Sequence, residues 1–181
     1  MKRSFGLWQL AGYAAVTLGG TLLHFFFDLT GGARWAAPFS GINESTWEHM
    51  KLLFWPLLLF ALIEYRFFSE KADVGCIKLR GMVLGLGLIP ILFYTYNGVI
   101  GKSPDWVNIA IFFLSAAAAF FYETWLWYNK TLRCRSPKTA WAVMCIIGAL
   151  FVLFTFVTPR IGMFRDPTNG RYGLDASEVS S

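Results

Sequence analysis

The sequence predicts an all-α, polytopic membrane bundle of five transmembrane helices. The 181 residues are 56% hydrophobic and 18% aromatic but only 15% charged, and the mean hydropathy of +0.49 is unusual for a soluble domain. Five apolar stretches are also long enough, at about 20 residues each, to cross the hydrocarbon core as helices. The basic residues fall mostly between these stretches, as they do in membrane proteins.

The five predicted helices follow one another with short polar connections. Lipid offers no partner for a free backbone amide, and the stretches lack the short alternation of barrel strands, so each is expected to be helical. The first begins like a signal peptide, but its apolar stretch is too long and no small-residue cleavage site follows it. The predicted helices run from Leu7 to Leu29, Trp47 to Phe68, Leu79 to Ile100, Trp106 to Tyr128 and Ala140 to Thr158.

Small residues and prolines within these stretches predict how the helices pack. Gly81 and Gly85 form a pair spaced by four in the third stretch, and residues 115–119 of the fourth are all small. Such residues let neighbouring helices approach closely. Pro56 in the second stretch and Pro90 in the third each free a carbonyl and are expected to kink their helices.

The distribution of basic residues predicts a cytoplasmic N-terminus and an external C-terminal tail. The same distribution accounts for the net charge of +5, so we expect the lipid bilayer as a partner and no nucleic acid. The three cysteines lack C-x-x-C or C-x-x-H spacing, so neither a disulfide framework nor a zinc knuckle is expected. The basic residues on the predicted cytoplasmic side are Lys2, Arg3, Arg66, Lys71, Lys78, Arg80, Lys130, Arg133, Arg135 and Lys138.

The whole chain is expected to form one transmembrane domain. Residues 1–174 would comprise the five helices and an ordered external tail, because the tail mixes turn-forming residues with aromatic anchors. Residues 175–181 read as a disordered C-terminus. An odd helix number cannot divide into the paired halves of many transporters, and homo-oligomer formation stays open.

Polar residues expected at the external rim form the main candidate site. His24 and Asp28 share one helix face, and Glu44 and Glu48 would do so if the second helix starts by residue 43. The residue types predict a metal site in which His24, His49 and Glu44 hold one divalent transition metal (Zn, Mn or Fe) and Glu48 or Asp28 acts as catalytic base. The expected polar rim is completed by Asn43, Tyr94, Asn97 and Asp166.

A structural interpretation of the same residues is equally open. Ser45 and Glu48 have the spacing of a capping box, and Lys51 stands one turn from Glu48. His24 would then be a histidine hydrogen-bonded to Asp28 with no ligand. These residues would only finish and solvate the helix ends.

Two further carboxylates, Glu64 and Glu123, are expected deeper in the membrane near the cytoplasmic side. A carboxylate there costs a few kcal/mol unless it is protonated or paired, and Arg66, Arg80 or a tyrosine is the expected partner. The default is a structural ion pair, and a proton relay is the alternative. Glu64 lies about 24 Å along the helix from Glu48, so the two layers cannot form one site.

The chain resembles the bacterial membrane protein family known as domain of unknown function 6512. The resemblance rests on "HFFFD", on "NESTWEHMK" followed by an apolar run containing Pro56, and on "FRDPTNGRYG" in the tail. It implies a small five-helix, multi-pass protein of the bacterial cytoplasmic (inner) membrane and no particular reaction. The motif positions coincide with His24, Asp28, Asn43, Glu44, Glu48, His49 and Asp166.

Three functions stay open at this point. The first is a membrane-embedded, metal-dependent hydrolase acting on a lipid or lipid-linked substrate at the rim. The second is a proton- or cation-coupled transporter subunit that uses Glu64 and Glu123 within an oligomer. The third is a non-catalytic scaffold or partner protein in which the polar residues close the bundle.

Overall fold

The computed structural model of the chain describes residues 2–69, 73–129 and 136–175. Over these ranges the protein is all-helical, with five long helices and no strand, which confirms the predicted fold class. The elements are α1 (Lys2–Leu29), α2 (Thr46–Phe68), α3 (Val74–Val99), α4 (Asp105–Asn129), α5 (Pro137–Phe156) and a short 3-10 helix η1 (Gly162–Phe164).

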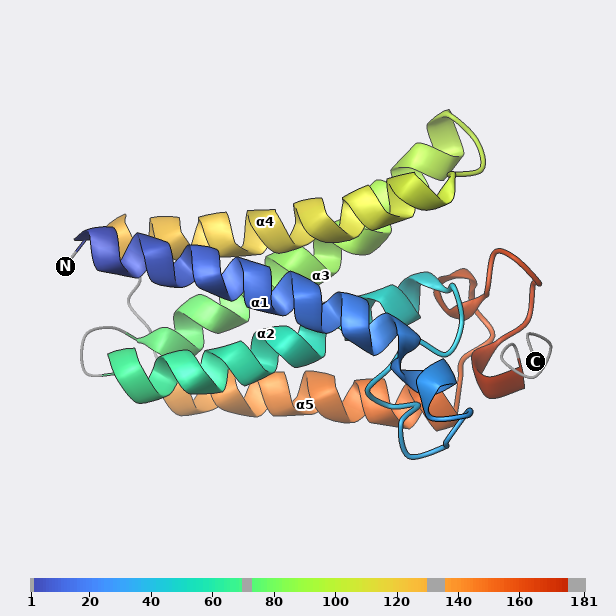
Figure 1. Cartoon of the computed structure of the whole chain (residues 1–181), viewed down its shortest axis with the longest axis horizontal. Coiled ribbons are helices and arrows are strands. Elements are labelled where there is room, and N and C mark those ends of the chain that lie inside the picture. Colours follow the sequence, from blue (N-terminus) through green and yellow to red (C-terminus); the bar gives the residue numbers. More distant parts are fainter. Residues whose placement is uncertain (1, 70–72, 130–135, 176–181) are drawn as a thin grey trace.

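The five helices run back and forth along one long axis (Figure 1). α1, α3 and α5 leave the end of the bundle that holds the N-terminus, and α2 and α4 return to it. The opposite end, called here the tail end, holds the α1–α2 connection, the α3–α4 connection and residues 157–175. The polar residues expected at the external rim therefore lie at the tail end, and Glu64 and Glu123 lie toward the end that holds the N-terminus.

α2 is the central helix and contacts α1, α3, α4 and α5. Its side chains Leu53, Phe54 and Leu57 are fully buried in a core to which all five helices contribute. Burial of such apolar side chains is the main stabilising contribution where the helices meet.

The predicted close approach of helices at small residues is confirmed between α3 and α4. A Cβ added to Gly85 would lie only 3.1 Å from the Cβ of Ala119 and 3.2 Å from the carbonyl oxygen of Ser115. The absence of a side chain at Gly85 therefore sets the distance between the two helices. Pro56 and Pro90 lie inside helices that continue past them.

Four helices in the described part of the chain are long and apolar enough to span a membrane, namely α1, α3, α4 and α5. α2 carries four charged residues, which separates it from the others: Glu48, Lys51, Glu64 and Arg66. The first three are buried among neighbouring helices, so they do not meet lipid. The protein is a multi-pass membrane protein, and its orientation and membrane remain predictions from the sequence.

Several expectations from the sequence need correction or concern residues outside the described ranges. α3 begins at Val74, five residues before the predicted start at Leu79, and so takes Lys78 into the bundle. Cys76 is disulfide-bonded, although the sequence predicted no disulfide framework, because spacing along a chain does not show which segments packing brings together. Disorder was expected for residues 175–181, of which 176–181 lie outside the described ranges, as do Lys71, Lys130, Arg133 and Arg135.

The α1–α2 connection folds back against the end of α1. The backbone N–H of Gly32 donates to the carbonyl of Phe27 and that of Gly31 to Asp28, and Gly31 has a φ of +66°. These bonds form the Schellman turn that glycine favours after a helix. Ser40 accepts a hydrogen bond from the N–H of Phe27 (2.8 Å) and donates to the carbonyl of Leu23 (2.5 Å), which anchors the far part of the connection.

The tail packs onto the same end of the bundle. Gly173 has a φ of +56° and lies so close to Thr158 that any side chain at position 173 would overlap the threonine hydroxyl. Its carbonyl accepts a hydrogen bond from Asn43 Nδ2 at 3.1 Å. The tail is thereby fixed both to the end of α5 and to the segment that precedes α2.

Candidate functional site

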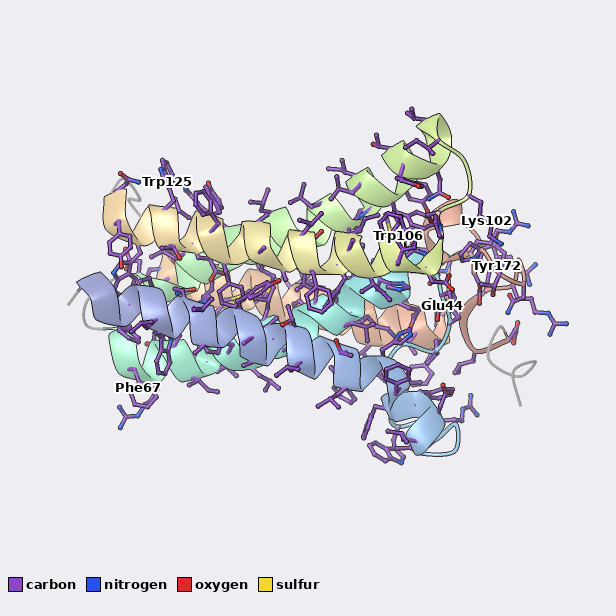
Figure 2. All side chains as sticks on the ribbon, turned by 45° about the horizontal axis from the view of Figure 1, so that its top comes forward. Glu44, Phe67, Lys102, Trp106, Trp125 and Tyr172 are labelled. Atoms are coloured by element: carbon purple, nitrogen blue, oxygen red, sulfur yellow. The ribbon has the colours of Figure 1, made fainter. Side chains whose placement is uncertain are left out.

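Three side chains from separate elements meet at the tail end of the bundle. His24 of α1 and His49 of α2 each place Nε2 3.6 Å from a different carboxylate oxygen of Glu44, which lies just before α2. The imidazole centroids are 5.9 Å apart. Figure 2 shows Glu44 at this end, together with Lys102 and Tyr172, while Phe67 and Trp125 lie at the other. We call His24, Glu44 and His49 the rim cluster.

The start of α2 explains why Glu44 faces the histidines. Ser45 is the N-cap, so Glu44 precedes the helix and does not share a helical face with Glu48. Asn43 Oδ1 accepts a hydrogen bond from the N–H of Ser45 (2.9 Å). Asp166 of the tail accepts one from the N–H of Glu44 (3.5 Å). The backbone around Glu44 is therefore fixed both by the preceding residue, Asn43, and by Asp166 of the tail.

The protonation of His49 is constrained by its backbone neighbour. Its Nδ1 lies 3.0 Å from the carbonyl oxygen of Ser45, an acceptor, so Nδ1 carries a proton that it donates. In a neutral ring the lone pair is then on Nε2, the atom 3.6 Å from the Glu44 carboxylate. At 3.6 Å the two atoms are beyond direct hydrogen-bond distance, so a water molecule has room to bridge them.

An apolar cavity of about 240 Å³ adjoins the two histidines. α1, α2 and α4 contribute its walls, and the half-exposed rings of His24 and His49 form its polar edge. Phe25, Ile109 and Phe113 are exposed on the lipid-facing sides of α1 and α4, so the cavity opens toward the membrane. Its full lining is Gly20, Thr21, His24, Phe25, His49, Leu52, Ile109, Phe112 and Phe113.

The close packing of α1 determines the inner wall of this cavity. A Cβ on Gly20 would lie 2.7 Å from the carbonyl oxygen of Leu52 and 2.5 Å from the ring of Phe112. Only glycine at position 20 lets α1 approach α2 and α4 so closely. The histidines on α1 and α2 are thus brought together by helix packing.

The described residues do not contain a group of three or more His, Cys, Asp or Glu side chains arranged to hold a metal ion. The structure therefore unites the three predicted ligands, His24, His49 and Glu44, without giving them the geometry of a metal site. What it places together is one carboxylate with an imidazole nitrogen near each of its two oxygens.

Glu48, one of the two predicted bases, lies apart from the rim cluster as a buried structural group. Its carboxylate is 2.6 Å from Lys51 Nζ and accepts a hydrogen bond from the N–H of Ile42 (3.0 Å). Lys51 also donates to the carbonyl of Ala37 (2.8 Å) and to Thr155 Oγ1 (3.1 Å). These bonds join the α1–α2 connection, α2 and α5. The structural interpretation therefore fits Glu48. Its N–H donates to Ser45 Oγ, as in a capping box, but its carboxylate binds Lys51 and the N–H of Ile42 instead of the N–H of Ser45.

Asp28, the other predicted base, is exposed and makes no ion pair with His24 within the described ranges. Tyr94 is 43% exposed on α3 and lies beside Gly162 of the tail, and Asn97 closes the α3–α4 connection by bonding Ser103. Asp166 accepts hydrogen bonds from the N–H and hydroxyl of Thr168 and so shapes the tail. These residues frame the tail end without joining the rim cluster.

The inner carboxylates form a buried ionic group with a lysine that sequence reasoning placed in a loop. Lys78 Nζ lies 2.9 Å from Glu64 and 2.6 Å from Glu123, and all three side chains are at most 1% exposed. Gln9 Nε2 donates to both oxygens of Glu64 at 3.1 Å, and Trp8 Nε1 donates at 3.3 Å. We call Glu64, Lys78 and Glu123 the buried triad.

Lys78 was expected to lie in the connection before the third helix, because the apolar run starts at Leu79. The expected partner of Glu64 and Glu123 was Arg66, Arg80 or a tyrosine, yet the structure pairs both carboxylates with Lys78. One signal was present: Gly81 lies one turn after Lys78, and the Glu123 side chain occupies the space that a Cβ there would need. A glycine one turn from a charged residue leaves space in which a carboxylate from a neighbouring helix can lie.

The fold and these two polar groups define an all-α, multi-pass membrane protein with a rim cluster at one end and a buried triad at the other. The chain belongs to a family of unknown function, DUF6512, whose model matches residues 2–174. No curated protein and no solved structure matches it.

Proposed function

We propose that this protein is a membrane-embedded hydrolase of a lipid or lipid-linked substrate, with the rim cluster as its acid–base site. The observation that carries the proposal is the position of His49 Nε2, fixed by the Nδ1 bond to Ser45 and directed to the Glu44 carboxylate beside an apolar cavity. Such a position suits a base whose ring orientation is set before substrate binds.

The chemistry that the three side chains can perform is proton transfer to and from water. His49, as the free base, would accept a proton from water that attacks an ester or phosphoester bond at the mouth of the cavity. Glu44 would stabilise the imidazolium that results, and His24, protonated at the start, would donate its proton to the leaving oxygen; transfer of the His49 proton to His24 through water then restores both rings. All three side chains are partly exposed, at 31% for His24, 19% for His49 and 45% for Glu44, so water and a head group can reach them.

The cavity favours a substrate that arrives from the membrane. Its walls are almost wholly apolar, it opens between α1 and α4 toward lipid, and only its histidine edge is polar. An acyl or isoprenyl chain in the cavity would bring the attached head group to the imidazoles. The sequence suggested a metal-dependent form of this hydrolase, in which His24, His49 and Glu44 hold a divalent metal. Elemental analysis of protein purified without chelator distinguishes the metal-dependent from the metal-free mechanism.

Transport through the inner carboxylates is less favoured. Glu64 and Glu123 are both ion-paired with Lys78, and about 24 Å of helix separates Glu64 from the level of Glu48. The buried triad fits a structural role better than that of a carrier.

The test is lipid turnover by the purified protein in nanodiscs made from bacterial membrane lipids, with products identified by mass spectrometry. Wild type is expected to release a hydrolysis product, and His49→Gln to reduce the rate by about 100-fold or more, the usual contribution of a general base. Lys102→Gln, an exposed change at the same end, is the matched control and should retain wild-type turnover. Equal rates in wild type and His49→Gln, or no product from either, would remove the proposal.

A further inference from the structure

A second cavity at the tail end is separate from the rim cluster. It measures about 650 Å³ and shares no lining residue with the cavity beside the histidines. Its walls come from three segments: the end of α1 with the α1–α2 connection, the end of α5, and the tail. The lining includes Phe27, Arg34, Thr155, Thr158, Arg160 and Tyr172.

Two arginines give this cavity a positive character. Neither Arg34 nor Arg160 has a carboxylate within ion-pair distance among the residues that the structure describes, and Asp175 is the one acidic side chain in the lining. Lys51 lies directly behind the wall, bonded to Thr155, but Glu48 neutralises it. Two unpaired guanidinium groups at one cavity favour an anion.

The hydroxyl groups of the lining show which donors are free for that anion. Thr155 Oγ1 donates to the carbonyl of Phe151 and Thr158 Oγ1 to that of Phe154, so both hydroxyl protons are already used. The Tyr172 hydroxyl makes no hydrogen bond within the described ranges and remains able to donate. The free donors are thus two guanidinium groups and a phenol, a set that suits the oxygens of a phosphate.

The cavity walls are held in place by the contacts that fix the tail and the α1–α2 connection. The Schellman turn at Gly31 and Gly32 sets the path of the chain two residues before Arg34. Gly173, packed on Thr158, fixes the neighbouring Tyr172 in the cavity lining. Because the walls are already ordered, less conformational entropy is lost when a ligand binds.

We propose that this cavity binds a phosphate-bearing organic group, with Arg34, Arg160 and Tyr172 on the phosphate. The volume lies within the range of ordinary ligand sites and exceeds what a single phosphate would fill, so the rest of the molecule also enters. Phe27 and Phe156 supply apolar wall for that part, and Phe156 is 48% exposed at the side of the membrane-spanning α5. The ligand is therefore a phospholipid head group or a soluble phosphate ester. This site is independent of the proposed hydrolysis.

The test measures binding of two phosphate ligands to the full-length protein in detergent by titration. The probes are dihexanoyl phosphatidylglycerol and glycerol phosphate, with phosphate-free monooctanoyl glycerol as the reference. The variant Arg34→Gln/Arg160→Gln is compared with Lys102→Gln/Arg171→Gln, which removes two exposed charges from the same end without touching the cavity. Both arginines of the cavity are exposed and unpaired, so folding is expected to be unaffected, as circular dichroism checks.

The expected result is binding of at least one phosphate probe, with its half-saturating concentration raised about tenfold or more in the cavity variant, since charged hydrogen bonds to phosphate are lost. The control variant should change it by less than about twofold, because exposed charges are screened. Binding of the phospholipid alone identifies a lipid source, and binding of glycerol phosphate as well identifies soluble esters. No binding of either probe, equal weakening in both variants, or equally tight binding of monooctanoyl glycerol would overturn the proposal.

Discussion

Replacement of Lys78 by methionine tests whether the buried triad stabilises the bundle through charge. Methionine keeps an unbranched side chain of similar length between the rings of Phe60 and Phe120, which lie 4.8 and 4.9 Å from Nζ, so little packing is lost. The change removes the one positive charge of the triad and leaves two buried carboxylates. Glu123 then has no hydrogen bond among the described residues, because Lys78 is its one donor there.

The expected loss follows from the burial of all three groups. Removal of one partner from a buried ion pair usually costs about 3–5 kcal/mol, since the remaining charge stays uncompensated. The free energy of unfolding, measured by SDS titration in mixed micelles with tryptophan fluorescence, should fall by that amount. Lys102→Met removes an exposed lysine and should change it by less than about 0.5 kcal/mol.

A triple variant separates charge from shape. Glu64→Gln/Lys78→Met/Glu123→Gln removes all three charges with little change in volume, so most of the lost stability should return. A free energy of unfolding for Lys78→Met within about 0.5 kcal/mol of the wild-type value would show that the ion pairs of the buried triad do not stabilise the bundle. It would show that the carboxylates find water or another partner when the amine is absent.

Two glycine substitutions test how the two ends are packed. Gly81→Ala places a methyl group against the Glu123 side chain and should destabilise the bundle by about 1–3 kcal/mol in the same titration, whereas Gly87→Ala, with open space around it, should be neutral or stabilising. Gly173→Ala combines a φ of +56° with overlap at Thr158, so amide exchange across the tail should accelerate about tenfold, from a cost of about 1–2 kcal/mol. Unchanged exchange in Gly173→Ala would contradict the described anchoring of the tail, and Gly87→Ala serves as its control.

The fold was largely predictable because apolar length dominates the sequence of a membrane protein. Each of the five predicted ranges corresponds to a helix, with ends displaced by a few residues. The displaced start of α3 has a physical cause: Lys78 interrupts the apolar pattern, yet it is buried against two carboxylates from other helices. A pattern read along one segment cannot show a counter-charge supplied by another.

The candidate site was predicted in part. Sorting polar residues by depth placed His24, Glu44 and His49 at one end of the bundle, and the structure brings them together. Helical spacing failed for the two proposed bases: α2 starts at Thr46, so Glu44 and Glu48 share no face, and Asp28 points to the exposed side of α1. Which side of a helix end faces inward depends on the connections, and these are not visible in local spacing.

If the histidines and the adjacent apolar cavity form one site for a membrane amphiphile, a lipid chain must enter that cavity. Photolabelling with a diazirine-bearing fatty acyl lipid, followed by peptide mapping, detects this. Labelling is expected to concentrate at Phe112 and Phe113 and to be abolished by Thr21→Trp, which fills the cavity. Labelling that simply follows lipid exposure, as strong at Leu59 as in the cavity and unchanged by Thr21→Trp, would contradict it.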